Sequence, residues 1–382
     1  MVGNRPQFIK AAAVSPLLRS RATELLLHTG QHFDDALSAV FFKELGIPAP
    51  EVQLEIAGGS NVTQTARMMT ALEPVFARER PDCVLVYGDT NSTLAGAMVA
   101  AAQRIPVAHV EAGMRSFDRS MPEELNRVMT DHLSTLLLCS TQVAAGNLAA
   151  EGIGRASGSL RQAVSANNRV SLPASGPQEP AASCRVVGDV MVDVARQAQP
   201  RARGRLDLLS EHGVTPRSYL LATAHRAGNV DDPARLLRLV KLLLGVSTAE
   251  MPVLLPLHPR TRERLEHAGL LSVLRQSPAV RLTPPLGYLE LTALLCNARA
   301  LLTDSGGLQK EAYLAGVRCL TMRENTEWVE TLSGGWNTLV SLDLDRAQRA
   351  LAAPVPAEHP QLYGDGRAGE RVVNALLEVF AA

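Results

Sequence analysis

Short apolar runs alternate along this chain with longer amphipathic stretches. Residues 82–87 read DCVLVY and residues 105–110 read IPVAHV, and each run predicts a buried strand. Residues 92–103, between them, predict a helix. Further strands are predicted at residues 136–139, 185–187, 219–223, 253–257 and 300–303. Strands that are apolar throughout and separated by helices indicate parallel sheets that are covered on both faces.

This alternation occurs in two series, which predicts an α/β protein with two doubly wound, Rossmann-like domains. The chain has 382 residues, enough for about two domains of roughly 150 residues each. We expect a first domain over residues 1–190 and a second over residues 191–366. A final helix is predicted over residues 368–380.

Residues 154–183 interrupt the alternation. This stretch is rich in Ser, Ala, Gly, Pro and Arg and has no aromatic residue. Such a composition cannot bury much apolar surface and indicates a flexible surface insertion. A functional lid is the alternative interpretation.

Composition and charge exclude several classes of function. Lys plus Arg and Asp plus Glu both number 38, so nothing indicates a nucleic acid or an anionic membrane as the main partner. The aromatic fraction of 4% disfavours a stacking platform for single strands. Five scattered cysteines without a CxxC pair argue against a disulfide framework or a structural zinc site. Because no signal peptide or membrane-spanning run is visible, we expect a cytoplasmic protein.

Polar or glycine-containing turns follow the predicted strands. In open α/β sheets, ligands bind beyond the carboxyl ends of the strands, so these turns are where chemistry is expected. Their presence after strands of both domains favours one active site in the cleft between the domains. The turns are GNRP (3–6), GDT (88–90), EAG (111–113), AHR (224–226), LHP (257–259) and DSGG (304–307).

The DSGG turn is the clearest candidate anion site. Ser305, Gly306 and Gly307 lie where a strand meets a helix, so their backbone N–H groups and the helix N-terminus could hold a phosphate. Glu311, one turn later, could accept hydrogen bonds from a ribose. A capped turn without a ligand is the alternative. The chain has no Walker A and no GxGxxG motif, which disfavours ATPase and dinucleotide functions.

Several acid–base groups accompany these turns. Asp89 and Glu111 end neighbouring strands, Glu123 lies on a helix that begins near Pro122, and His225 ends a strand of the second series. A single carboxylate at a strand end is commonly a solvated turn residue. Several together with a histidine suit removal and return of a proton on a weakly acidic carbon. No HExxH or GxSxG motif is present, and no metal site is expected.

In this order of motifs the chain closely resembles the UDP-N-acetylglucosamine 2-epimerase family, in its non-hydrolysing branch. The resemblance spans residues 3 to about 340, and the shared order is more specific than any single motif. The motifs are GNRPQFIK (3–10), TGQH (29–32), YGDT (87–90), VEAGMR (110–115), PEELNR (122–127), VGDV (187–190), TAHR (223–226), DSGG (304–307) and RENTEW (323–328).

The resemblance implies a GT-B architecture, with a nucleotide sugar in the cleft between two Rossmann-like domains and the last helix returned to the first domain. It also implies a homodimer and no cofactor. In the reaction of this branch, a base removes the proton on C2 and UDP leaves C1. The resulting 2-acetamidoglucal then regains UDP and takes a proton on its other face. The product we expect is UDP-ManNAc from UDP-GlcNAc.

Residue roles carry over by motif matching. Four residues match the catalytic positions: Asp89, Glu111, Glu123 and His225. Eight match substrate or UDP-binding positions: Arg5, Lys10, Arg127, Tyr288, Ser305, Gly306, Gly307 and Glu311. Among these, Arg5 and Lys10 match positions near the diphosphate or uridine, and Tyr288 matches the aromatic residue near the uracil. Four more match a regulatory UDP-sugar site found in some bacterial members: Gln31, His32, Arg67 and His258.

The chain departs from the usual family pattern at three places. Gly228 stands where members usually carry an acidic residue, and residues 58–64 read GGSNVTQ instead of the commoner GGSHGEQT. The strand that normally precedes the GxRP turn is reduced to Met1 and Val2, so we expect a neighbouring strand to be partly unpaired.

Four other functions stay open. The TEW segment and the Asp231-Asp232-Pro233 stretch also resemble members that act on UDP-2,3-diacetamido-glucuronate. A hydrolysing epimerase that releases UDP and ManNAc is a second alternative. The others are a retaining GT-B glycosyltransferase and a nucleotide-sugar-binding protein without activity, although the presence of all four catalytic-type residues argues against the last.

Residues 154–183 give a first testable prediction. A variant that replaces them with a short linker should keep its turnover, because the segment contributes little to a packed core. Turnover and thermal unfolding of the two proteins are compared. A large loss of turnover with an unchanged fold would instead identify the segment as a lid or an interface.

Overall fold

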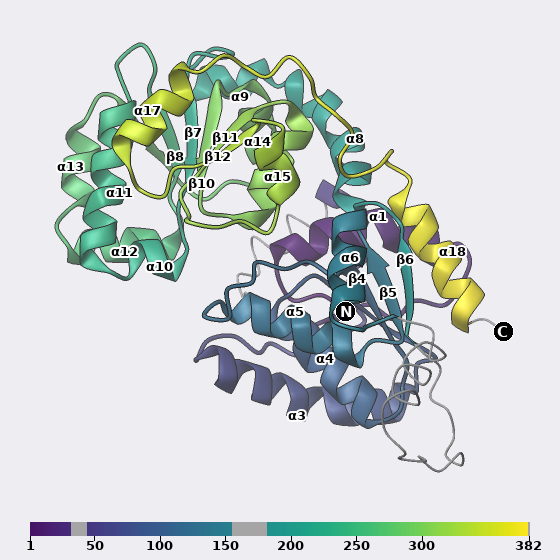
Figure 1. Ribbon diagram of the computed structural model, residues 1–382. Coiled ribbons are helices and arrows are strands. Elements are labelled where there is room, and N and C mark those ends of the chain that lie inside the picture. The colour runs from purple at the N-terminus through teal and green to yellow at the C-terminus, as the bar shows by residue number, and fades with distance from the viewer. Residues whose placement is uncertain (32–43, 155–181, 381–382) are drawn as a thin grey trace, which may run out of the picture. The chain divides into compact units, whose positions relative to one another are not determined.

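The computed structural model describes residues 1–31, 44–154 and 182–380. The chain divides into two compact units, one formed by Met1–Asp193 with Tyr363–Ala382 and the other by Val194–Leu362 (Figure 1). Within the described ranges, no helix combines the length and the hydropathy that a bilayer span requires.

The first unit alternates parallel strands with helices. Its strands are β1 (Leu27–His28), β2 (Val52–Gln53), β3 (Val84–Tyr87), β4 (Val107–Ala112), β5 (Leu136–Cys139) and β6 (Ser183–Val186). Its helices are α1 (Arg5–Arg19), α3 (Asn61–Glu79), α4 (Asn91–Ala102), α5 (Pro122–Leu133), α6 (Gln142–Ala150), the start of α8 (Val190–Arg203) and α18 (Ala368–Phe380). The strands β3 to β6 pair in sequence order, and β1 pairs with β2, all in parallel.

Residues 1 and 2 lie between these two groups of strands. The Val2 N–H donates to the Leu27 carbonyl and the Thr29 N–H to the Val2 carbonyl, both at 2.9 Å. On the other side, the Met1 nitrogen donates to the Leu85 carbonyl of β3 at 2.8 Å. The order β2, β1, residues 1–2, β3, β4, β5 is that of a Rossmann sheet. Residues 1 and 2 make an isolated bridge to β1 and one hydrogen bond to β3, and the two groups of strands form separate sheets, which agrees with the partial loss of pairing that the sequence predicted.

Local sequence explains where the helices of the first unit begin. Thr90 and Thr93 form a capping box at the start of α4, and the Ser60 side chain caps α3. Pro122 occupies the first turn of α5, where its missing N–H costs nothing. Apolar residues of α3 and α4 then pack with β3 in one core, which includes Met68, Leu72, Val86 and Val99.

The second unit contains a parallel sheet that is six-stranded over the described residues, in the order β12-β11-β10-β7-β8-β9. The strands are β7 (Leu220–Thr223), β8 (Val253–Pro256), β9 (Val280–Thr283), β10 (Ala300–Thr303), β11 (Arg318–Thr321) and β12 (Asn337–Leu339). The helices are α9 (Leu206–Glu211), α10 (Ala227–Val230), α11 (Pro233–Val246), α12 (Pro259–His267), α13 (Leu271–Gln276), α14 (Tyr288–Asn297), α15 (Gly306–Ala315), α16 (Val329–Ser333) and α17 (Leu344–Ala352). Read from β9, this is again the doubly wound Rossmann order.

Helices cover both faces of this sheet. Leu220 and Ala222 of β7 belong to a core with α11, whereas Leu221, between them, belongs to a second core with α14 and α15. Because successive side chains of a strand point to opposite faces, a strand buried on both sides must be apolar at every position. The continuous apolar runs of the sequence have this origin, and the predicted α/β class with two Rossmann-like units is confirmed.

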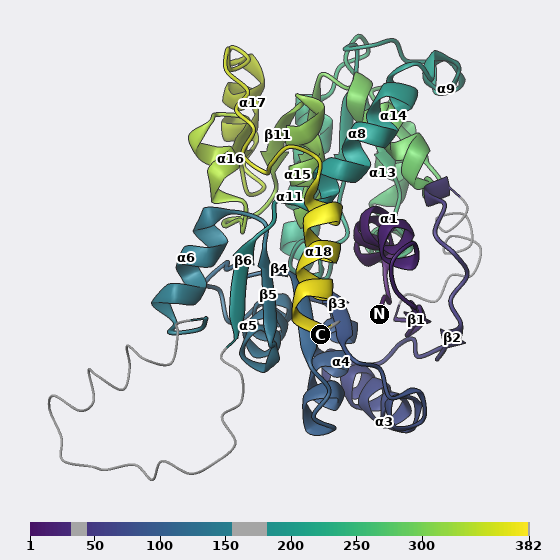
Figure 2. The same cartoon turned by 90° about the vertical axis from the view of Figure 1, so that its right-hand side faces the viewer.

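The helix α18 closes the first unit beside α1 (Figure 2). The Asp193 carboxylate accepts hydrogen bonds from the Ala368 and Gly369 N–H groups at 3.1 and 2.9 Å, so it caps the first turn of α18. A Cβ atom on Gly369 would lie 2.3 Å from the Ala13 carbonyl oxygen of α1. The close approach of the two helices therefore requires glycine at this position.

The contact between α18 and α1 predicts a specific loss of stability. Gly369→Ala should lower the free energy of unfolding by about 2 kcal/mol, because the new methyl group must push the helices apart. Gly146→Ala is the matched control, since Gly146 is helical, exposed and has open space around its Cβ position. Urea denaturation measures both changes. Equal stability of the two variants would show that the helices do not depend on this contact.

Candidate functional site

Glu111 occupies a β-bulge at the carboxyl end of β4. Val110 pairs with Leu138 and Ala112 with Cys139, so Glu111 is the extra residue of the bulge. Its φ of 74° lies in the left-handed region that non-glycine residues rarely adopt. Bulges next to active sites redirect a side chain, and strained backbone of this kind concentrates at functional sites. The strand predicted at residues 105–110 ends too early, because pairing continues to Ala112.

The buried Glu111 carboxylate forms an ion pair with the Lys10 ammonium of α1, which is also buried. The turn at Gly88 lies directly against this pair. A Cβ atom on Gly88 would lie 2.8 Å from Lys10 Nζ and 3.1 Å from Glu111 Oε2, and the φ of Gly88 is +64°. Glycine is therefore required by the backbone and by the ion pair. Lys10, predicted near the diphosphate or uridine, pairs in this structure with a predicted catalytic carboxylate.

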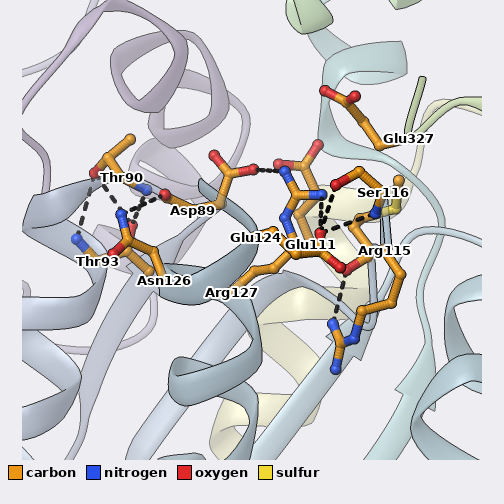
Figure 3. A network of polar contacts seen from close by, with 12 residues as sticks. Asp89, Thr90, Thr93, Glu111, Arg115, Ser116, Glu124, Asn126, Arg127 and Glu327 are labelled. Carbon is orange, nitrogen blue, oxygen red and sulfur yellow. Dashed lines mark hydrogen bonds and ion pairs between the residues drawn. The ribbon is translucent and has the colours of Figure 1, made fainter. Parts of the chain in front are cut away.

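A second set of charges surrounds Arg127 of α5 (Figure 3). The buried guanidinium forms ion pairs with Asp89, which follows β3, and with Glu124, whose Oε2 lies 3.0 Å away. Glu124 also accepts hydrogen bonds from the Ser116 N–H at 2.8 Å and the Phe117 N–H at 3.0 Å. Arg127, on α5, thus holds the Asp89 side chain in place through this ion pair.

Glu123 precedes Glu124 in the first turn of α5 and is half-buried. A carboxylate is stabilised there by the positive end of the helix dipole. Asn126, one turn later on the same helix, donates to the Asp89 carbonyl at 3.0 Å and to Asn91 Oδ1 at 3.2 Å. The start of α5 therefore positions both the main chain and the side chain of Asp89.

Beneath this cluster lies a fully buried network that the sequence analysis did not identify. His109 of β4 lies with Nδ1 2.7 Å from the Asp131 carboxylate and with Nε2 2.7 Å from the Gly88 carbonyl oxygen. Asp131 also accepts from Arg115 Nη1 at 2.7 Å and from the Gly113 N–H at 3.1 Å. Asp131 and His109 consequently brace the turn at Gly88 and the chain just after the bulge.

In the second unit, His225 follows β7 and is partly exposed. Its Nδ1 lies 3.4 Å from Asp304 Oδ1, and its ring stacks on that of His258 with centroids 5.4 Å apart. Asp304 is fully buried at the end of β10. The neighbouring strand ends therefore bring together residues from three of the predicted turns.

The turn after β10 has the geometry expected of a phosphate site. The helix α15 begins at Gly306, with Ser305 at the N-cap making no side-chain capping hydrogen bond. A Cβ atom on Gly307 would meet nothing within 4 Å, whereas one on Gly306 would lie 2.3 Å from Glu327 Oε1. Glu311 and Tyr288 are both buried in this unit. Their predicted roles at the ribose and the uracil remain predictions, as does that of Arg5 at the start of α1.

The candidate regulatory residues fall in both units. Gln31 accepts hydrogen bonds from the Ser92 N–H and hydroxyl at 3.1 and 2.6 Å, and Arg67 donates to the Ala57 carbonyl at 3.2 Å. His258 is exposed at the N-cap of α12. His32, and residues 155–181 of the predicted insertion, lie outside the described residues. In the part of the chain that is described, no three His, Cys, Asp or Glu side chains are grouped to hold a metal ion.

Comparison with known proteins decides the family. A family model described as UDP-N-acetylglucosamine 2-epimerase matches residues 18–377. The chain belongs to this family. It is 43% identical to the UDP-2,3-diacetamido-2,3-dideoxy-D-glucuronate 2-epimerase of Pseudomonas aeruginosa, over 99% of both chains. It is 37% identical to the UDP-N-acetylglucosamine 2-epimerase of Methanocaldococcus jannaschii, over 98% of this chain and 97% of the relative.

A solved structure agrees with this assignment. The fold matches the crystal structure of the Methanocaldococcus jannaschii UDP-GlcNAc 2-epimerase in complex with UDP-GlcNAc and UDP, with a TM-score of 0.86 and 36% identity. The match covers 99% of this chain and 98% of that one. The predicted GT-B-like fold is thereby confirmed. Membership of the UDP-N-acetylglucosamine 2-epimerase family supports 2-epimerase activity on a UDP-sugar and places the protein among the isomerases.

The Asp131 network gives a prediction about stability and pH. Burial alone raises the pKa of Asp131, but His109 and Arg115 outweigh burial and hold the pKa below the ordinary value of 3.8. A carboxylate with a lowered folded-state pKa stabilises the fold above its unfolded-state pKa, and this contribution is lost as the pH falls through the folded-state value.

Asp131→Asn should therefore lower the free energy of unfolding at pH 7 by about 3 kcal/mol, because it removes the buried carboxylate that pairs with Arg115 and contacts His109. The difference from the parent should shrink as the pH falls below about 4. Urea denaturation across this range measures it, with the exposed Asp82→Asn as control. A difference that does not change with pH would rule out the ion pairs as its cause.

Proposed function

We propose that this protein catalyses the reversible C2 epimerisation of a UDP-2-acetamido sugar without hydrolysis. The observation that supports this most strongly is the set of carboxylates at the carboxyl ends of β3 and β4, which carry buried counter-charges. Family membership gives the reaction class, and this cluster gives the acid–base groups that such a reaction needs.

The proposed reaction has two reversible halves. A carboxylate removes the proton on C2, and the electron pair of that C–H bond forms a double bond to C1 as the C1–O bond to UDP breaks. The intermediate is 2-acetamidoglucal, with UDP as the leaving group. UDP then adds back to C1 while C2 takes a proton on its opposite face. Atoms and electrons balance without an oxidant, a reductant or a cofactor.

The acid–base groups we assign are Asp89, Glu111 and Glu123 of the first unit and His225 of the second. Lys10 places a positive charge beside the buried Glu111 carboxylate, and Arg127 places one beside the partly exposed Asp89 carboxylate. An ionised carboxylate is ready to accept a proton, and a positioned group of this kind contributes about 10²–10⁴-fold to a rate.

UDP binding is assigned to the second unit. Ser305, Gly306 and Gly307 offer backbone N–H groups at the start of α15, where the helix dipole favours an anion. Glu311 would accept hydrogen bonds from the ribose, and Tyr288 would lie near the uracil.

Two sugars are candidates for the substrate. UDP-GlcNAc, converted to UDP-ManNAc, is the first, because it is bound in the matched archaeal epimerase structure. UDP-2,3-diacetamido-glucuronate is the second, because a relative named for it is 43% identical over 99% of both chains. The homodimer implied by the sequence resemblance stays a prediction. Light scattering tests it by measuring whether the mass in solution is twice that of one chain.

Incubation in deuterated water distinguishes these activities. Each candidate sugar is supplied separately, and the products are analysed for deuterium at C2 and for free UDP. Deuterium at C2 with UDP still attached supports the proposal and identifies the substrate. Free ManNAc with UDP would indicate a hydrolysing epimerase, and no exchange with either sugar would indicate a binding protein.

The carboxylate assignment predicts the effect of neutral substitutions. Glu111→Gln and Glu123→Gln should each reduce C2 deuterium exchange by about 10²-fold or more, because the amide keeps the shape but cannot accept the proton. UDP affinity, measured by calorimetry, should change much less. The exposed Glu73→Gln on α3 is the control. Exchange at the parent rate in both variants would make these carboxylates structural only.

The phosphate site predicts a loss of binding. Gly307→Val should reduce UDP affinity at least ~10-fold, because the side chain would extend into the open space beside the first N–H groups of α15. Gly307 is a cleaner target than Gly306, whose Cβ would displace Glu327. Gly146→Val, in the first unit, is the control for a valine placed in open space on a helix. Unchanged UDP affinity in Gly307→Val would refute the site.

A further inference from the structure

Asp304 is a buried charge to which the sequence comparison assigned no role. It follows β10 directly and is fully buried. Its own N–H donates to the Thr223 carbonyl of β7, the strand next to β10. The carboxylate therefore lies where the ends of two central strands meet, between the turn that carries His225 and the turn that begins with Ser305.

Several donors hold this carboxylate in one orientation. The His225 N–H lies 3.1 Å from both carboxylate oxygens, and the Arg226 N–H lies 3.0 Å from Oδ2. Asn229 Nδ2 donates to Oδ2 at 3.2 Å and to the Met322 carbonyl at 2.9 Å. Hydrogen bonds to an ionised acceptor are stronger than neutral ones, so the whole turn from His225 to Asn229 is organised around Asp304.

The same carboxylate also faces the His225 ring. Asp304 Oδ1 lies 3.4 Å from Nδ1, and the His225 ring stacks on the His258 ring with an interplanar angle of 29°. A carboxylate beside one ring nitrogen favours the tautomer that carries the proton on that nitrogen. With the proton on Nδ1, the lone pair of the neutral ring is on Nε2. The carboxylate would also stabilise the imidazolium that forms when Nε2 accepts a proton.

The position of Asp304 in the chain adds a second consequence. Residues 305–307, which we assign to the diphosphate, come directly after it. The Ser305 N–H donates to the Thr303 hydroxyl at 3.0 Å, which lies 2.7 Å from the Thr223 hydroxyl. One buried carboxylate thus ties the histidine turn to the phosphate turn, so the distance from the histidine to the leaving phosphate would be set by the sheet.

We propose that Asp304 is a positioning residue: it fixes the orientation and the tautomer of His225, so that Nε2 is the nitrogen that exchanges a proton during epimerisation. This inference rests on the proposed function for the role of His225 in the reaction. The contacts from which the tautomer is argued lie within the second unit, and the tautomer can be measured without any substrate.

The first experiment is a double-mutant cycle on C2 deuterium exchange. Asp304→Asn should reduce exchange by about 10²-fold in the parent, which is the contribution expected of a positioned acid–base group. In a His225→Gln background it should change exchange by no more than about twofold, since its effect passes through the histidine. UDP affinity should stay near that of the parent. Equal losses in both backgrounds, or a loss of UDP affinity, would overturn the proposal in favour of a structural role.

A matched control and a direct readout complete the test. Asp345→Asn neutralises an exposed carboxylate on α17 of the same unit, and its exchange should stay within about twofold of the parent. In the parent labelled with ¹⁵N-histidine, the His225 signals, assigned by their loss in His225→Gln, should show a protonated Nδ1 and an unprotonated Nε2 in the neutral ring. A neutral ring protonated on Nε2 would overturn the proposal, even if Asp304→Asn failed to fold.

The NMR readout also separates this inference from the proposed function. If the parent exchanged no deuterium with either UDP-sugar, the proposed function would fail. The tautomer of His225, and its change in Asp304→Asn, would still support or overturn the positioning role of Asp304.

Discussion

The ion pair between Lys10 and Glu111 is the interaction on which the first unit's site depends. Glu111 stands on a bulge with strained backbone, and its carboxylate is buried. A buried charge without a partner costs several kcal/mol, and the Lys10 ammonium supplies an opposite charge to the Glu111 carboxylate. The same ion pair favours glycine at residue 88, because a Cβ atom there would lie 2.8 Å from Lys10 Nζ. The conformation of Glu111, the choice of glycine at residue 88 and the location of Asp89 therefore form one linked arrangement.

Both units place charged side chains at the carboxyl ends of central parallel strands, but the partners of these charges differ between the units. In the first unit, cations on α1 and α5 hold carboxylates that we assign to proton transfer. In the second, the Asp304 carboxylate is held by backbone N–H groups and lies beside a histidine. Strand ends in such sheets present unpaired backbone groups at a common edge, so residues from distant turns converge there. Within each unit, this brings residues from several short loops to one edge of the sheet.

Much of this arrangement could be predicted from the sequence, because it depends on local patterns. The apolar runs located the central strands, and the final helix was predicted at residues 368–380, where α18 lies. The strand at residues 105–110 was displaced by two residues, since the bulge at Glu111 lets pairing resume at Ala112. No local pattern signals a bulge at a glutamate. Motif order identified the family, and the comparisons bear this out.

The contacts that define the candidate site could not be predicted, because they join residues far apart in the chain. Lys10 and Glu111 are separated by 101 positions, and His225 and Asp304 by 79. The matching of motifs therefore associated Lys10 with the diphosphate and left Asp304 without a role. The only sequence signal for Asp304 was its position directly after a strand. The first residues of the other turns have the same position, so this signal does not single out Asp304.

The most direct test of this account is the effect of Lys10 on proton transfer and on nucleotide binding, measured in the same variants. If Lys10 acts through Glu111, Lys10→Met should reduce C2 deuterium exchange by about tenfold or more, with UDP affinity close to that of the parent. Lys10→Arg should restore part of the exchange, because it returns the positive charge. If Lys10→Met instead exchanged at the parent rate, or lost UDP affinity while exchange of bound substrate was kept, the central role of the ion pair would be contradicted.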